Sequence, residues 1–145
     1  MQIKVEVNEA LLILLEDAVF NYLDILEWTF DICDTEAMTE NVKHHLSIHP
    51  NIVAKIRRYL RKNKQKLKLT QEERVFLMSA IAVSLPGDGG YLYSLAQLLP
   101  KFNLLHVHNM ETAVYNYMYD QFDRVPLDDD HQKMFEVFKT LYSFG

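Results

Sequence analysis

The sequence has little cysteine, glycine and proline, with one Cys, four Gly and four Pro among 145 residues. The single cysteine, Cys33, excludes an internal disulfide and a zinc site built from several thiolates, and it suits a reducing compartment. The scarcity of glycine and proline argues against collagen-like, linker-rich and disordered chains. It also argues against an all-β fold, because such folds need many turns.

Long hydrophobic runs are missing as well. An apolar stretch near the start, residues 11–15, is followed at once by Glu16 and Asp17, so we expect no membrane-spanning helix. The first ten residues alternate between polar and apolar side chains and do not resemble a secretion signal. These features predict a cytoplasmic, intracellular protein.

Apolar and aromatic residues, in contrast, are abundant. Hydrophobic residues make up 49% of the chain, and eight Phe and eight Tyr are among them, which is ample for a packed core. At this length we expect residues 1–145 to form a single helical domain.

The net charge of −5 is unevenly distributed along the chain. Residues 1–54 carry a charge of −8, residues 55–74 carry +7, and residues 75–145 carry −4. The chain is therefore an acidic body with one basic segment, which differs from a generally basic nucleic-acid-binding protein.

The basic segment, residues 55–68, contains eight cationic side chains and no acidic one. These eight residues, which we name the basic ridge, are Lys55, Arg57, Arg58, Arg61, Lys62, Lys64, Lys66 and Lys68. The apolar residues Ile52, Ile56 and Tyr59 recur at helical spacing. We therefore expect a helix over residues 52–63 that lies on the core and has a positive outer face.

The basic ridge has two interpretations. It is either a solvated helix face, near the acidic first third of the chain, or a docking surface for an anionic partner such as nucleic acid, an acidic protein or a membrane. Lys and Arg on one surface can neutralise phosphates without reading bases. Tyr59 is the one aromatic residue in the ridge segment, and a single ring is no platform for stacking bases.

Residues 75–85 are predicted to form the centre of the core. Ser79 and Ser84 are the only polar side chains in this run, and a helix that is apolar on all sides is buried on all sides. Thr70 and Glu73 have the spacing of a capping box, which predicts where this helix begins. We predict an all-α fold, a single compact bundle of six or seven helices around residues 75–85.

The remaining helices follow from caps and helix breakers. Asn8 and Asp128 are predicted N-caps, for a long first helix that reaches residue 34 and for the last helix. Pro50 is expected to end a short helix, because the residue before a proline avoids helical backbone angles. The other predicted segments are a connection over 35–39 and helices over 40–48, 91–99 and 110–123, the last of them capped by Asn109.

Residues 2–7 alternate between polar and apolar side chains, which is the pattern of a short strand. A strand needs a hydrogen-bonding neighbour, and residues 103–108 lie in the other β-prone segment. We therefore predict a minor two-stranded ribbon that pairs 2–7 with 103–108. The alternatives are that residues 2–7 pair across a homodimer or extend the first helix.

The histidines are the first candidates for chemistry. His45 and His49 are four residues apart, as two metal ligands on one helix face would be, and His44 adjoins them. His106 and His108 would point the same way in an extended segment. Neither group has the Glu or Cys partners of a known zinc motif, so we predict no metal site and no cofactor.

Three other motifs have simpler structural explanations. The glycines of residues 87–90 lack the Lys and the Ser or Thr of a phosphate-binding loop. The aspartates at 128–130 lack the spaced oxygen ligands of a calcium loop, and helix capping accounts for them. Cys33 lies on an apolar stripe, which favours a buried and inert thiol.

Tyrosines are dense in residues 91–93 and 115–119. Outward-facing tyrosines would form an aromatic contact patch for a protein partner, to which we assign Tyr59, Tyr115 and Tyr119. Because no coherent catalytic set is present, we predict a non-enzymatic interaction protein such as an inhibitor, an immunity-like protein or a regulatory subunit. The alternative is a nucleic-acid-binding protein that uses the basic ridge.

Overall fold

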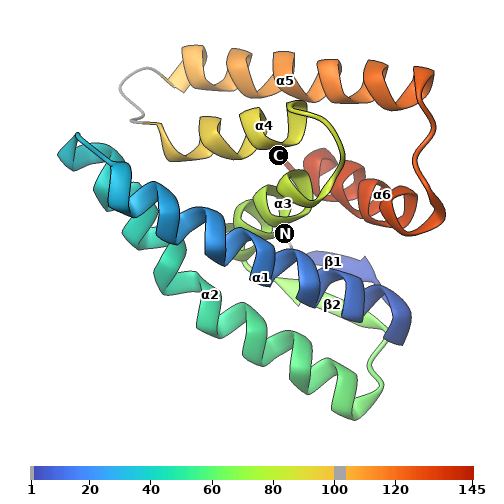
Figure 1. The fold of residues 1–145 in the computed structure, drawn as a ribbon. Coiled ribbons are helices and arrows are strands. Elements are labelled where there is room, and N and C mark those ends of the chain that lie inside the picture. The colour runs from blue at the N-terminus through green and yellow to red at the C-terminus, as the bar shows by residue number, and fades with distance from the viewer. Residues whose placement is uncertain (1, 100–103) are drawn as a thin grey trace.

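The computed structural model describes residues 2–99 and 104–145, with only the backbone for 104–108. Within these residues the chain forms six helices and two short strands (Figure 1). In chain order they are β1 (Ile3–Glu6), α1 (Glu9–Ile32), α2 (Glu36–Lys62), β2 (Lys66–Leu69), α3 (Gln71–Ser84), α4 (Gly89–Leu98), α5 (Leu104–Arg124) and α6 (Asp129–Ser143). The prediction of an all-α bundle with a minor β ribbon is confirmed.

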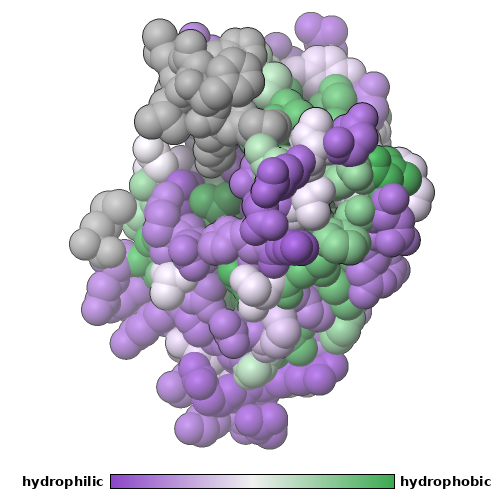
Figure 2. Space-filling model, turned by 90° about the vertical axis from the view of Figure 1, so that its left-hand side faces the viewer, coloured by the Kyte–Doolittle hydropathy of each residue, from purple (hydrophilic) through white to green (hydrophobic). Residues whose placement is uncertain are grey.

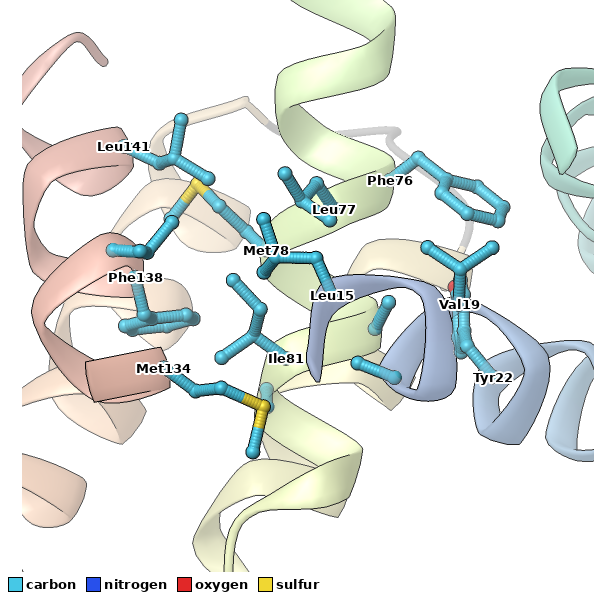
Figure 3. Close-up of a cluster of buried hydrophobic side chains, with 14 of the residues drawn as sticks. Leu15, Val19, Tyr22, Phe76, Leu77, Met78, Ile81, Met134, Phe138 and Leu141 are labelled. Atoms are coloured by element: carbon cyan, nitrogen blue, oxygen red, sulfur yellow. The ribbon is translucent and has the colours of Figure 1, made fainter. Parts of the chain in front are cut away.

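Helix α3 lies in the middle of the molecule and packs against α1, α2, α4 and α6. Figure 3 shows Leu77, Met78 and Ile81 of α3 between side chains of α6 on one side and of α1 on the other. All three are buried. Fully burying one such side chain contributes about 1.5–3 kcal/mol, so the predicted role of this apolar helix as the centre of the core is confirmed.

The predicted helix starts are confirmed where a side chain caps them. Asn8 Oδ1 accepts a hydrogen bond from Leu11 N at 2.8 Å, and α1 begins at the next residue. Thr70 and Glu73 form the reciprocal capping box of α3. Asp128 caps α6 by accepting from His131 N at 2.9 Å. In each case the cap satisfies a backbone amide that has no partner within its own helix.

Helix α2 corrects the prediction of a break before Pro50. It is one continuous helix that begins after Thr35 and passes through Pro50. An internal proline costs about 3 kcal/mol, because it removes a backbone hydrogen bond and crowds the preceding turn. The buried stripe of α2 continues on both sides of Pro50, with Ile48 before it and Ile52 after it, and its burial against α1 outweighs that cost.

The ribbon exists, but its predicted partner was wrong. Strand β1 pairs antiparallel with β2, with Ile3 opposite Leu69 and Val5 opposite Leu67. Residues 104–108 belong to α5 instead, which also removes the predicted cap at Asn109, and residue 103 lies outside the described residues. Both strands present alternate apolar side chains to the core, so each completes the other's buried face.

Helices α4 and α5 lie side by side at one end of the molecule, far from the C-terminal end of α2 (Figure 1). Helix α4 approaches α3 so closely that a Cβ at Gly90 would overlap the carbonyl oxygen of Ala82. Only glycine fits this position, which explains part of the glycine cluster that follows α3.

Candidate functional site

The basic ridge is divided between two elements. Lys55 to Lys62 lie on the C-terminal half of α2, whereas Lys66 and Lys68 lie on β2. On β2 the lysines point outward because Leu67 and Leu69 take the alternate, buried positions. The ridge therefore continues from a helix end onto a strand.

The two parts of the basic ridge enclose a surface hollow of about 650 Å³, which we name the basic hollow. Its described lining residues are Lys55, Arg58, Tyr59, Lys64, Gln65, Lys66 and Lys68. Five of these carry a positive charge and none is acidic. Such a concave cationic surface concentrates positive potential, which attracts phosphate or carboxylate groups.

Two ridge residues are bound to the protein's own carboxylates. Lys55 Nζ lies 2.6 Å from Glu73 Oε1 and also donates to the Lys68 carbonyl oxygen at 2.9 Å. Arg57 Nε lies 3.1 Å from Glu16 Oε2 on α1. Of the two contacts, Arg57 with Glu16 joins the ridge to the acidic first third of the chain, whereas Lys55 pairs with a residue of α3.

The other six cations remain available. Arg58, Arg61, Lys62, Lys64, Lys66 and Lys68 are exposed. No described carboxylate lies within ion-pair distance of any of them. Like charges that are three or four residues apart on a helix, such as Arg58 with Arg61 and Lys62, repel each other by a few tenths of a kcal/mol per pair. Most of the basic ridge is thus uncompensated positive charge.

Tyr59 forms the floor of the basic hollow. Its side chain is only 4% exposed, and its hydroxyl oxygen accepts a hydrogen bond from Lys68 N at 3.4 Å. The Arg58 guanidinium carbon and Lys64 Nζ lie 5.8 and 5.2 Å from the centre of its ring. These cation–π contacts hold two cations beside the hollow, but a buried ring offers no stacking surface.

The three tyrosines assigned to a contact patch are not one surface. Tyr115 and Tyr119 lie on α5, at the opposite end of the molecule from Tyr59 (Figure 1). The Tyr115 ring stacks on Tyr142 with centroids 3.9 Å apart, and burial raises the pKa of its hydroxyl. Tyr119 is exposed. The assignment of Tyr59 to this patch was therefore wrong.

Lys4 was missed by the sequence reasoning. Strand pairing puts Lys4 directly opposite Lys68 and Glu6 opposite Lys66, so both enlarge the outer face of the ribbon. The signal was present, because Lys4 and Glu6 alternate with Ile3 and Val5. Only the identity of the paired strand brings Lys4 to the ridge.

The histidines near residue 45 have three different environments. His45 is buried, with its Nδ1 2.9 Å from the Tyr22 hydroxyl, and His44 is exposed, 3.8 Å from Glu72. His49 contacts the Phe20 ring, and burial lowers its pKa. Among the described residues no group of three or more His, Cys, Asp or Glu is arranged to hold a metal ion. His106 and His108 are helical rather than extended, and their side chains lie outside the described set.

Helix α1 exposes hydrophobic side chains beside the basic ridge and beyond it. They are Ile13, Phe20, Trp28, Phe30 and Ile32. Figure 2 shows the side of the molecule on which α1 connects to α2. On this side hydrophobic residues form a continuous band, and the lower end of the molecule is mainly hydrophilic. Phe20 directly adjoins the ridge, because the Arg57 guanidinium carbon lies 5.5 Å from its ring centroid. Cys33, at the end of α1, is half-buried rather than fully buried.

No family model matches this chain, and no curated protein and no solved structure is significantly similar to it.

None of the helices in the described ranges 2–99 and 104–145 is both long enough and apolar enough to cross a membrane.

Proposed function

We propose that this protein is a non-enzymatic interaction protein that binds an acidic surface of a protein partner at the basic ridge. The observation that carries the proposal is the set of six exposed cations without an internal counter-charge, four of which line a hollow with no acidic lining residue among those described. Uncompensated charge of one sign speeds association with an oppositely charged surface and selects against partners of like charge.

The surroundings of the ridge favour a protein partner over nucleic acid. Phe20 and Ile13 are exposed on α1, and Phe20 lies against Arg57, so an apolar and aromatic margin borders the cations. Aromatic residues and arginine are enriched in protein interfaces. The net charge of −5 also repels any extended polyanion that reaches past the ridge.

Nucleic acid is the second candidate, because the basic hollow offers cations from a helix and a strand to consecutive phosphates. The burial of Tyr59 counts against base stacking, so such binding would be independent of sequence. The two candidates predict different behaviour in one experiment.

The experiment is affinity capture from cells that naturally produce the protein. Arg58→Glu/Lys66→Glu is compared with the control Arg124→Glu/Lys133→Glu, which makes the same change in net charge at exposed cations outside the ridge. We expect the wild type and the control to retain a stoichiometric protein that is stable to nuclease and released by salt, and the ridge variant to lose it. Equal capture by the ridge variant contradicts the proposal, and material removed by nuclease supports nucleic acid.

A further inference from the structure

A second hollow lies between α2, α3 and α4, and the basic ridge takes no part in it. Its volume is about 340 Å³, at the lower end of the range of about 300–1,000 Å³ that small-molecule sites occupy. Its polar lining residues are Asn41, His44, His45, Gln71, Glu72 and Gln97. The aliphatic side chains of Ile48 and Val75 complete the described lining.

Gln97 is the unusual member of this cavity. Its side chain is 6% exposed, yet within the described residues it makes no hydrogen bond. A carboxamide has two N–H donors and an acceptor oxygen, and those of Gln97 are not among the fully buried polar atoms that lack a partner, so they open onto the cavity. A ligand in the cavity would therefore exchange hydrogen bonds with this amide.

The polar groups around Gln97 are held in place. The ring of His45 is buried and fixed by the hydrogen bond between its Nδ1 and the Tyr22 hydroxyl. Asn41 Nδ2 donates to the carbonyl oxygens of Leu98 and Leu99, at 3.0 and 3.2 Å. Because these side chains are positioned before any ligand binds, little conformational entropy is lost on binding.

The lining also restricts the ligand's charge. None of the described lining residues is Lys or Arg, and Glu72 contributes a carboxylate, so the described part of the lining favours an uncharged ligand over an anion. Carboxamide side chains recognise a donor and an acceptor that lie side by side on one edge of a planar base, as Asn and Gln do with adenine. The aliphatic side chains of Ile48 and Val75 suit the apolar faces of such a ring.

We propose that this cavity binds an uncharged nucleobase, with the Gln97 carboxamide as its principal hydrogen-bonding partner. The base belongs either to a free nucleoside or to an exposed nucleotide of a strand, and the recognising chemistry is the same. A metal ion is not favoured here, because no three of the described His, Cys, Asp and Glu residues are grouped to hold one.

The test uses the full-length protein and uncharged nucleosides, so that the basic ridge does not contribute. Adenosine, guanosine, cytidine and uridine are titrated while NMR follows the Gln97 side-chain amide. We expect saturable shifts for at least one of them, and a loss of affinity of tenfold or more in Gln97→Met, which preserves the length of the side chain. Gln132→Met, at an exposed glutamine on α6, is the matched control and should bind as the wild type does.

A second variant covers the case in which Gln97→Met fails to fold. Val75→Phe enlarges a half-buried side chain in the cavity wall and should block binding as well. Failure of all four nucleosides to give a saturable shift overturns the proposal, and so does unchanged affinity in a folded variant. A short oligoadenylate separates the two sources when it is titrated against Arg58→Glu/Lys66→Glu, in which the ridge's own attraction for phosphates is weakened. Tighter binding than that of adenosine to the same variant then indicates that the base belongs to a strand.

Discussion

Lys55 and Glu73 form an ion pair that joins α2 to the first turn of α3, with Nζ and Oε1 2.6 Å apart. The same carboxylate oxygen accepts a hydrogen bond from Thr70 N as part of the capping box. One buried carboxylate therefore fixes the helix start, the connection from β2 and one edge of the basic hollow.

We expect Glu73→Gln to lower the free energy of unfolding by about 2 kcal/mol. The glutamine can still accept from Thr70 N, but Lys55 is left as a largely buried cation without a counter-charge, and breaking one partner of such a pair is costly. Urea unfolding measures the change. Glu72→Gln, at the exposed neighbouring position, is the control and should change stability by less than about 0.5 kcal/mol. An equally small effect in Glu73→Gln contradicts the prediction.

We expect Pro50→Ala to stabilise the protein by about 2 kcal/mol. Alanine restores the backbone hydrogen bond within α2 and removes the crowding by the ring, a gain of about 3 kcal/mol, whereas the loss of proline's stiffness in the unfolded chain opposes it by about 1 kcal/mol. Thermal and urea unfolding of the variant measure the net change. A lower midpoint in both would mean that α2 relies on a bend at Pro50.

The positive ridge is expected to limit the stability of the free protein slightly. Arg58→Glu replaces repulsion from Lys62 with an attraction at the favourable i,i+4 order, while it loses a weak contact with the Tyr59 ring. We expect its free energy of unfolding to be unchanged or higher by up to about 0.5 kcal/mol. Chemical unfolding tests this directly. A loss above about 1 kcal/mol would show that Arg58 serves the fold, and reduced partner capture by variants at Arg58 would then be ambiguous.

His49 is expected to make stability depend on pH. Burial is the main cause of its lowered pKa, and its Nε2 has no hydrogen-bond partner among the described residues. Below about pH 6.5 the unfolded chain therefore takes up a proton that the folded chain resists, so stability falls as the pH drops from that value toward the folded pKa. His49→Phe removes this contribution.

The measurement is urea unfolding of the wild type and His49→Phe between about pH 7.5 and about pH 5.5. The other histidines are the same in both proteins, so the difference between the two slopes isolates His49. We expect the shallower slope in the variant. Identical slopes would mean that the pKa of His49 is the same in the folded and unfolded chains.

The starts of α1, α3 and α6 could be read from the sequence because a cap is a local interaction. Asn8, Thr70 and Asp128 each bond to an amide only three residues away. The behaviour of Pro50 could not be read in this way. A proline disfavours helical angles at the residue before it, but the burial that overrides this local preference comes from packing against α1, which is distant along the chain.

The residues of the candidate site could be predicted from the sequence, but their positions relative to one another could not. All eight cations of the basic ridge were evident from composition, but their division between α2 and β2 was not. The pairing of Lys55 and Arg57 with carboxylates on α3 and α1 depends on how the helices pack. The cavity around Gln97 gave no signal at all, because its lining residues come from three helices and share no motif.

The amino-acid order alone determined that this chain is mainly helical, that residues 75–85 are central, that a strand opens it and that eight of its fifteen Lys and Arg residues lie in one segment. These properties depend on the periodicity of apolar side chains, on helix capping and on the charges of residues that are close together in the sequence. The tertiary structure decided that β1 pairs with β2, that α2 continues through Pro50, and that six of the eight ridge cations stay exposed without a described carboxylate partner. Each of these outcomes depends on the free energy of contacts between residues that are far apart in the chain. A local sequence pattern carries no information about such contacts.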